Sequence, residues 1–283
     1  MNNPLTTTQA TLLPSKEETT CNLPCLRGTS SAQLQLAFIT ASYRDICLHE
    51  MNSVALFRRV DTKFGMTFSQ LQTILPELRN DYRILTIHGQ RFQPYRTLYF
   101  DTPDFDLFRL HINDRADQYK VRIREYEATQ QTFLEVKHKT QKCRTIKTRK
   151  PLNAALPILG QDEMDWLSGN LPAQYLDLEP NLLNEFTRIV LVDNHLTERI
   201  TLDINIKFSF GANAYCANQV VVAEVKQSSR HQPSYFMEIM HRYHLRSMGF
   251  SKYCLGISSL YHNIKTNAQK SQLLWIKRAN GGI

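Results

Sequence analysis

The stretch QYKVRIREY alternates cations with aliphatic residues. Its cations are Lys120, Arg122 and Arg124, and Val121 and Ile123 lie between them. Because successive side chains of a β-strand point to opposite faces, a strand here carries three like charges on one face. Like charges close together repel one another, so the pattern fits either a basic face turned to solvent or a face that binds an anion.

Five further stretches place charged or polar residues on one face of a strand: RRVDTKF, FLEVKHK, RTIKTRK, TLDINIKF and VVAEVKQ. In TLDINIKF, the predicted polar face consists of Thr201, Asp203, Asn205 and Lys207. Between Val54 and Gln227 the alternation predicts about eight strands. The repetition of the pattern favours a shared charged surface over an isolated basic strand.

Segments with apolar residues at helical spacing lie between these strands: FSQLQTILPELRND, FDLFRLHIND, NAALPILGQDEMDWLSG and SYFMEIMHRYHLRSMG. Such helices need an apolar surface to cover, and the strands supply it. We therefore predict an α+β fold in which a closed eight-stranded antiparallel β-barrel has its helices packed outside, because closure removes exposed strand edges. The charged faces then line a tunnel suited to a polyanion, since arginine can grip phosphate oxygens in a bidentate fork.

The chain has 283 residues, of which 42% are hydrophobic, and a formal net charge of +8. We expect a disordered leader over residues 1–33, a helical segment over 34–52, the tunnel domain over 53–262 and a tail over 263–283. The six cysteines lack zinc-site spacing and no apolar run reaches the ~18 residues of a membrane span, so we expect a cytoplasmic protein. Nucleic acid is disfavoured as a partner because aromatic residues do not interleave with the basic ones as a base-stacking platform requires.

Nine stretches in order resemble the VTC domain, the polyphosphate polymerase branch of the triphosphate tunnel metalloenzymes in the CYTH-like superfamily. They run from about Phe57 to Leu260 and read FRRVDTKF, YRTLYFDTPDFDLF, YKVRIREY, FLEVKHKT, TIKTRK, EFTRIVL, RITLDINIKF, VVAEVKQ and FSKYCLGISSLY. Their order over most of the chain makes the resemblance specific.

The resemblance implies a tunnel that binds ATP and a polyphosphate chain together with a divalent metal, Mn²⁺ or Mg²⁺. The catalytic residues it implies are Lys63, Arg122 and Arg124, and the metal ligand is Glu224. The further substrate-binding residues it implies are Lys137, Lys147, Arg188, Arg199, Lys226 and Lys252. A membrane-protein partner that receives the product is also an expectation.

One motif departs from the superfamily. The triphosphatase branch begins with Glu-x-Glu-x-Lys, whereas this chain has Arg59-Val60-Asp61-Thr62-Lys63. Fewer carboxylates at the metal weaken the activation of water for hydrolysis. We therefore expect metal-dependent transfer of the terminal phosphate of ATP to polyphosphate, with two alternatives: a triphosphatase or tripolyphosphatase in the same tunnel, and a non-catalytic polyphosphate-binding module.

Several of these residues have a second interpretation. Lys142 or Arg149 can supply the contact expected of Lys147, and Lys252 can cap a surface turn. Glu224 can serve as an ion-pair partner of Lys226 instead of a metal ligand. The remaining alternatives are ion pairs of Arg188 and Arg199 with Asp203 or Glu185, and metal ligation by Asp203 or Glu135.

Overall fold

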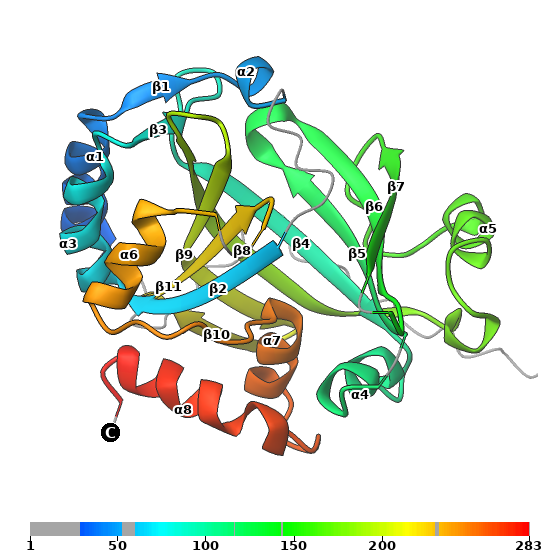
Figure 1. Ribbon diagram of the computed structural model, residues 1–283. Coiled ribbons are helices and arrows are strands. Elements are labelled where there is room, and N and C mark those ends of the chain that lie inside the picture. Colours follow the sequence, from blue (N-terminus) through cyan, green and yellow to red (C-terminus); the bar gives the residue numbers. More distant parts are fainter. Residues whose placement is uncertain (1–28, 53–59, 116, 143, 230–231, 283) are drawn as a thin grey trace, which may run out of the picture.

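A computed structural model describes residues 29–52, 60–115, 117–142, 144–229 and 232–282 (Figure 1). The helices in these ranges are α1 (Thr29–Ala41), α2 (Leu48–Asn52), α3 (Phe68–Leu78), α4 (Asp106–Ile112), α5 (Gln161–Ser168), α6 (Tyr235–Arg242), α7 (Lys252–Leu260) and α8 (Lys270–Ala279). Short 3₁₀ turns occupy Glu127–Thr129, Ala173–Tyr175 and Asn267–Gln269. Most of the leader predicted over 1–33 lies outside the described residues, as does Arg59.

Eleven strands form one sheet. They are β1 (Arg44–Ile46), β2 (Val60–Thr67), β3 (Tyr82–Leu85), β4 (Gln93–Asp101), β5 (Gln118–Tyr126), β6 (Gln131–Lys139), β7 (Thr145–Leu152), β8 (Glu179–Asp193), β9 (Glu198–Phe210), β10 (Asn213–Ala217) and β11 (Val220–Gln227). Eight follow one another in the order β2-β11-β9-β8-β4-β5-β6-β7, and all of these neighbours are antiparallel. The α+β class is confirmed, although the segment predicted as helical over 34–52 also contains β1.

The predicted closure of the barrel is not confirmed. Within the described residues β2 and β7 do not pair, so the sheet curls but stays open between its two end strands. The outer edge of β2 has another partner, because the Met248 backbone N–H donates to the Lys63 carbonyl at 2.9 Å and Phe64 forms a bridge with Ser247. This segment occupies the edge that β7 needs for closure.

Helices α1, α3, α5 and α6 cover the convex side of the sheet, as the sequence predicts, whereas α7 and α8 pack against its inner face, which corrects the prediction that the helices lie outside. In Figure 1, α1, α3 and α6 lie together on one side, over β2, β11 and β9, and α5 lies beside β5–β7. The first group buries apolar residues such as Leu71, Ile74 and Phe236 against Ile200 and Ala223. Among the residues that the structure describes, no helix is both long enough and apolar enough to cross a membrane.

A β-bulge in β9 changes which side chains face the inside of the curled sheet. Two residues separate Ile204 from Lys207, whereas one separates their partners on β8, and the extra residue, Asn205, has a φ of 52°. Asparagine tolerates this left-handed conformation better than most residues. The prediction that Thr201, Asp203, Asn205 and Lys207 share one face of β9 is therefore wrong beyond Asp203. Lys207 lies on the outer face, 3.7 Å from Glu185.

After the bulge, the inner face of β9 is apolar and receives α7. Ile206 and Phe208 belong to the cluster that α7 and α8 complete with Leu255 and Ile276. A Cβ atom added at Gly256 would lie 2.5 Å from a methyl of Leu182 and 2.8 Å from the ring of Phe208. The close approach of α7 to the sheet therefore requires glycine at this position.

We expect Gly256→Ala to lower the free energy of unfolding by about 1–3 kcal/mol, because overpacking a tight core outweighs the gain in helix propensity. The measurement is urea unfolding followed by circular dichroism. Gly249→Ala is the control, since the nearest atom to its added Cβ is 4.0 Å away. A Gly256→Ala midpoint at or above that of the wild type would contradict the tight contact.

Candidate functional site

The inner face of the curled sheet gathers the predicted site residues. The registers place Lys63 opposite Glu224, Arg122 opposite Glu135, and Lys137 opposite Lys147. Over its central part this face carries eleven cations and four carboxylates. The cations are Lys63, Lys120, Arg122, Arg124, Lys137, Lys147, Arg149, Arg188, Arg199, Lys226 and Lys252, and the carboxylates are Asp61, Glu135, Asp203 and Glu224. All ten residues that the sequence indicated are thus brought together, and their roles stay predictions.

The deeper carboxylates are each shared by two cations. Glu135, whose side chain is 0% exposed, lies 2.8 Å from Arg122 and 2.5 Å from Lys147. Burial alone raises the pKa of the Glu135 carboxyl, but Arg122, Arg124 and Lys147 outweigh this effect and lower it to about 2. Glu135 is therefore ionised at neutral pH and neutralises part of the surrounding charge.

Asp203 has the same arrangement on the opposite wall. Arg188 approaches it with Nε at 2.6 Å and Nη2 at 2.8 Å in a bidentate pair, and Lys252 of α7 pairs with it as well. Burial raises the pKa of this carboxyl, but Arg188 and Lys252 outweigh it and lower the pKa to about 2. The alternative ion pair considered for Arg188 is thus present, and Lys252 reaches into the tunnel while lying at the start of α7.

Glu224 is the third shared carboxylate. Its Oε1 lies 2.9 Å from Lys63 Nζ and 2.8 Å from Lys226 Nζ. Burial raises the pKa of Glu224, but the two lysines hold it well below its usual range. Lys226 also lies 3.4 Å from Asp61. The ion pair of Glu224 with Lys226, considered as the alternative to metal ligation, is therefore present.

Three buried or half-buried cations of the inner face, Lys120, Arg124 and Lys137, form no ion pair with a carboxylate of the described residues, and neither does the exposed Arg149. Lys120 donates to the Ser251 hydroxyl at 3.0 Å and Arg124 donates to Thr97 at 3.2 Å. Lys120 also lies directly opposite Lys137, the third of these cations. Burial, with Lys120, Arg122 and Lys63 nearby, lowers the pKa of Lys137 to about 7. The inner face therefore carries more positive charge than its carboxylates neutralise.

A cavity of about 400 Å³ opens at the end of this cation cluster. The cavity is lined by Lys63 of β2 on one side and by Lys120 of β5, Lys137 of β6 and Thr145 of β7 on the other, so both end strands of the sheet, β2 and β7, contribute to it. His111 also lines the cavity, and burial together with Lys120 and Lys137 lowers its pKa to about 3. His111 is neutral at physiological pH and adds no charge.

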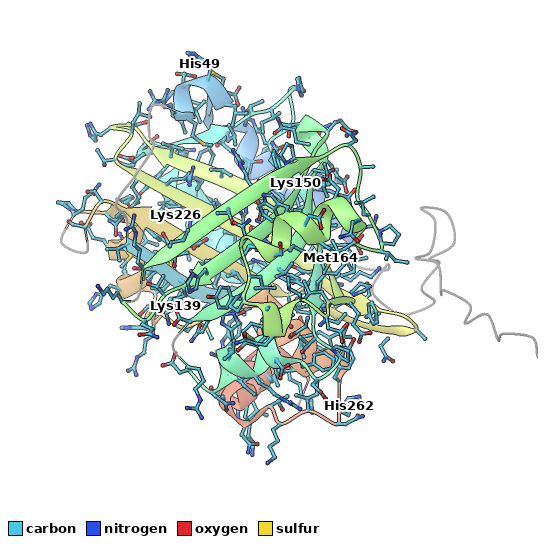
Figure 2. All side chains as sticks on the ribbon, turned by 90° about the vertical axis from the view of Figure 1, so that its right-hand side faces the viewer. His49, Lys139, Lys150, Met164, Lys226 and His262 are labelled. Carbon is cyan, nitrogen blue, oxygen red and sulfur yellow. The ribbon has the colours of Figure 1, made fainter. Side chains whose placement is uncertain are left out.

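Figure 2 looks onto the side of the molecule with β7 and α5, where Lys150 and Met164 are labelled.

Aromatic residues also face the cations, and the sequence analysis missed them. Tyr95 stacks on Phe186 with ring centroids 5.1 Å apart, and Arg188 lies 4.9 Å from the Tyr95 centroid. Lys252 lies 4.6 Å from the centroid of Phe186, and Arg149 lies 4.7 Å from that of Phe133. The expectation that aromatic residues do not interleave with the basic ones is therefore wrong for this face, because these aromatics share strand faces with cations. Only strand pairing shows which face is inside.

The oxygen donors around Glu224 fit a divalent cation that also binds phosphate. Thr201 lies opposite Glu224 on β9, and its buried Oγ1 has no hydrogen-bond partner. Carboxylate and hydroxyl oxygens suit hard cations such as Mg²⁺ and Mn²⁺. In the described part of the chain no three His, Cys, Asp or Glu residues cluster as a metal site. The residues therefore fit a metal held jointly with substrate phosphates better than one held by protein alone.

No curated protein matches this chain. Among solved structures, a putative adenylate cyclase from Vibrio parahaemolyticus is 14% identical, with 71% of this chain and 98% of that chain covered and a TM-score of 0.40. The PH1012 protein from Pyrococcus horikoshii OT3 is 10% identical, with coverages of 72% and 99% and a TM-score of 0.42. The S. pombe Pct1 RNA triphosphatase, solved with the Spt5 CTD, is 11% identical, with coverages of 71% and 80% and a TM-score of 0.29.

Structural similarity at this level carries no argument about function. The sequence profile of the VTC domain, by contrast, matches residues 58–261, which is well over half of the chain. The match spans all eight strands of the main path from β2 to β11 together with α7. The chain therefore belongs to the VTC domain family.

Proposed function

We propose that this protein is a phosphotransferase that moves the terminal phosphate of ATP to a polyphosphate chain inside the tunnel, with a divalent metal. The observation that carries the proposal is the group of cations without an ion-pair carboxylate, the buried Arg124 and the half-buried Lys120 and Lys137. Such a cluster is unfavourable when empty, because desolvated like charges repel, and a polyanion relieves the repulsion. Membership of the VTC domain family supports the same conclusion.

The proposed roles follow from position. Arg122, Arg124 and Lys63 hold the reacting phosphates, and the other inner-face cations bind the rest of the two substrates. Glu224 with Thr201 would hold the metal, which supplies neutralisation of the charge on the phosphate oxygens. The substrate-binding set is Lys137, Lys147, Arg188, Arg199, Lys226 and Lys252.

Phosphoryl transfer through a loose transition state requires mainly alignment and charge stabilisation. Arg122 and Arg124 project from one face of β5, two residues apart, and can approach neighbouring phosphate oxygens from the same side. Their guanidinium groups are fixed by Glu135 and Thr97, at 2.9 Å and 3.2 Å from Nε. Because the two guanidinium groups are held in place before a ligand binds, they favour attack by the terminal phosphate of a polyphosphate chain over attack by water. Few carboxylates lie near Glu224, which also disfavours activation of water.

The direct test incubates the purified protein with ATP and MnCl₂ or MgCl₂ and resolves the products by gel electrophoresis and phosphorus NMR. Long phosphate chains are the expected result. Orthophosphate as the sole product would overturn the proposal in favour of a triphosphatase. ATP that is bound but unchanged would overturn it in favour of a binding module.

We expect Lys137→Met to stabilise the free protein by about 1–3 kcal/mol at pH 7 and to weaken tripolyphosphate binding roughly 10-fold. The wild-type side chain is costly because burial and nearby cations lower its pKa to about 7. Between that pH and ~10.4, the ordinary pKa of lysine, the unfolded chain binds more protons than the folded one. The contribution of Lys137 to stability therefore rises with pH over this range.

The measurements are urea unfolding and calorimetric titration with tripolyphosphate from pH 6 to 9. The wild type should bind tripolyphosphate more tightly than Lys137→Met at pH 6, and this difference in affinity should shrink as the pH rises through 7, because Lys137 loses its proton. Titration of the ligand itself affects both proteins equally. Lys207→Met is the matched control, since Lys207 lies on the outer face beside Glu185. Equal affinities of the wild type and Lys137→Met at pH 6 would contradict a phosphate contact by Lys137.

We expect Glu224→Gln to raise tripolyphosphate affinity in the absence of metal, since Lys63 and Lys226 lose their shared partner. The increase in affinity that Mn²⁺ brings should disappear, and turnover should fall by orders of magnitude. Calorimetry with and without MnCl₂ measures the first two effects, and the product assay measures the third. Glu185→Gln on the outer face is the control. Unchanged metal dependence would move the metal to Asp203 or Glu135.

A further inference from the structure

We propose that Tyr99 is a further phosphate-binding residue, whose hydroxyl donates a hydrogen bond to an oxygen of the phosphoryl group that Arg122 and Arg124 hold. This inference rests on the proposed function of the tunnel. It adds a neutral hydrogen-bond donor beside the two arginines that are proposed to hold the reacting phosphates.

Tyr99 lies in the middle of the cation cluster. It occupies β4 directly opposite Arg122 on β5, and Thr97, two residues away on the same face, lies opposite Arg124. Arg122 Nη1 lies 3.4 Å from the Tyr99 hydroxyl oxygen, and the guanidinium carbon lies 5.9 Å from the ring centroid. Tyr99 is only 4% exposed, so its hydroxyl is largely shielded from bulk water.

The ring of Tyr99 is fixed from behind. It stacks on Tyr253 of α7, with centroids 4.9 Å apart and an angle of 28° between the planes. Tyr253 in turn donates its hydroxyl proton to Asp101. Asp101 also accepts backbone N–H groups from Leu107 and Phe108, each at 2.8 Å, at the start of α4. The position of the Tyr99 ring therefore depends on a buried network and needs little ordering when a ligand binds.

The proton of the Tyr99 hydroxyl meets no acceptor in the described residues. The hydroxyl oxygen accepts from Arg122, but the hydroxyl itself donates to none of them. Other tyrosines near the tunnel differ, since Tyr126 donates to Glu135 at 3.4 Å and Tyr253 donates to Asp101. A buried donor without an acceptor is costly, and an anion held by the neighbouring arginines supplies one.

The surrounding charge makes this hydroxyl a better donor. Burial raises the pKa of Tyr99, but Arg122, Arg124 and Lys120 together outweigh burial and lower the pKa below its ordinary value. A more acidic hydroxyl hydrogen-bonds more strongly to an ionised acceptor. A bound phosphate adds negative charge beside the phenol, which raises its pKa again and keeps the proton in place to be donated.

The test compares the wild type with Tyr99→Phe, which keeps the stacked ring and removes the hydroxyl. We expect calorimetric titration with tripolyphosphate, without metal, to show a 10- to 100-fold weaker affinity, the range for one hydrogen bond to a charged group. Tyr119→Phe is the matched control, because Tyr119 lies on the opposite face of β5, stacked on His138, and should bind as the wild type does. Circular dichroism confirms that both variants are folded.

The outcomes separate the two proposals. Tight binding by the wild type with an equal affinity for Tyr99→Phe overturns the role of Tyr99 and leaves the proposed function standing. Failure of the wild type to bind either tripolyphosphate or longer polyphosphate overturns the proposed function, and the Tyr99 contact with it. A weaker affinity of Tyr99→Phe, with the affinities of the wild type and Tyr119→Phe equal, supports both the contact of Tyr99 and the proposed function.

A second measurement needs no variant. Tyrosine ionisation is followed by absorbance at alkaline pH, with and without tripolyphosphate. We expect an early ionisation step in the free protein, from the tyrosine beside the cations, and a shift of that step to higher pH in the complex. An early step that does not move when tripolyphosphate is bound would overturn the contact even if Tyr99→Phe failed to fold.

Discussion

The sharing of buried carboxylates between pairs of cations holds the inner face of this protein together. Each shared carboxylate joins different elements: Glu135 on β6 links β5 and β7, Asp203 on β9 links β8 and α7, and Glu224 on β11 links to β2. Breaking a buried pair by removing one partner typically costs about 3–5 kcal/mol. A sheet with this many inward cations can fold because three of its carboxylates each lie between two cations and reduce the repulsion within that pair.

The same arrangement explains why the free protein is left with an excess of positive charge. Four carboxylates face eleven cations, and Lys137 shows the consequence, since its pKa falls to about 7. If Lys137 binds phosphate as proposed, its contributions to stability and to function are opposed. The convex side offsets the repulsion among these cations, because α1, α3 and α6 bury a separate apolar core there that does not involve the inner face.

The sequence predicted the eight strands of the main path, the helices on the convex side and the residues that share the inner face, because period-two alternation survives wherever a strand is regular. It missed the short strands β1, β3 and β10 and the packing of α7 and α8 on the inner face. It failed at Lys207, where the bulge at Asn205 reverses the faces of β9, since an inserted residue is not visible in the alternation itself. It also failed at closure, because the competition of Ser247 with β7 for the edge of β2 is a long-range contact. Tyr99 was missed because its own strand carries no run of cations.

Pairing each carboxylate with two cations has a consequence for binding. If Arg122 turns toward a phosphate, Glu135 still has Lys147 at 2.5 Å, and if Lys63 does so, Glu224 still has Lys226 at 2.8 Å. A carboxylate with a single partner would instead be left as an uncompensated buried charge whenever that partner bound the ligand. Because each of these carboxylates has two cationic partners, one partner can bind an anion while the other still pairs with the carboxylate, so that no buried carboxylate is left uncompensated. The carboxylates that stabilise the inner face can therefore keep their positions when an anion binds there.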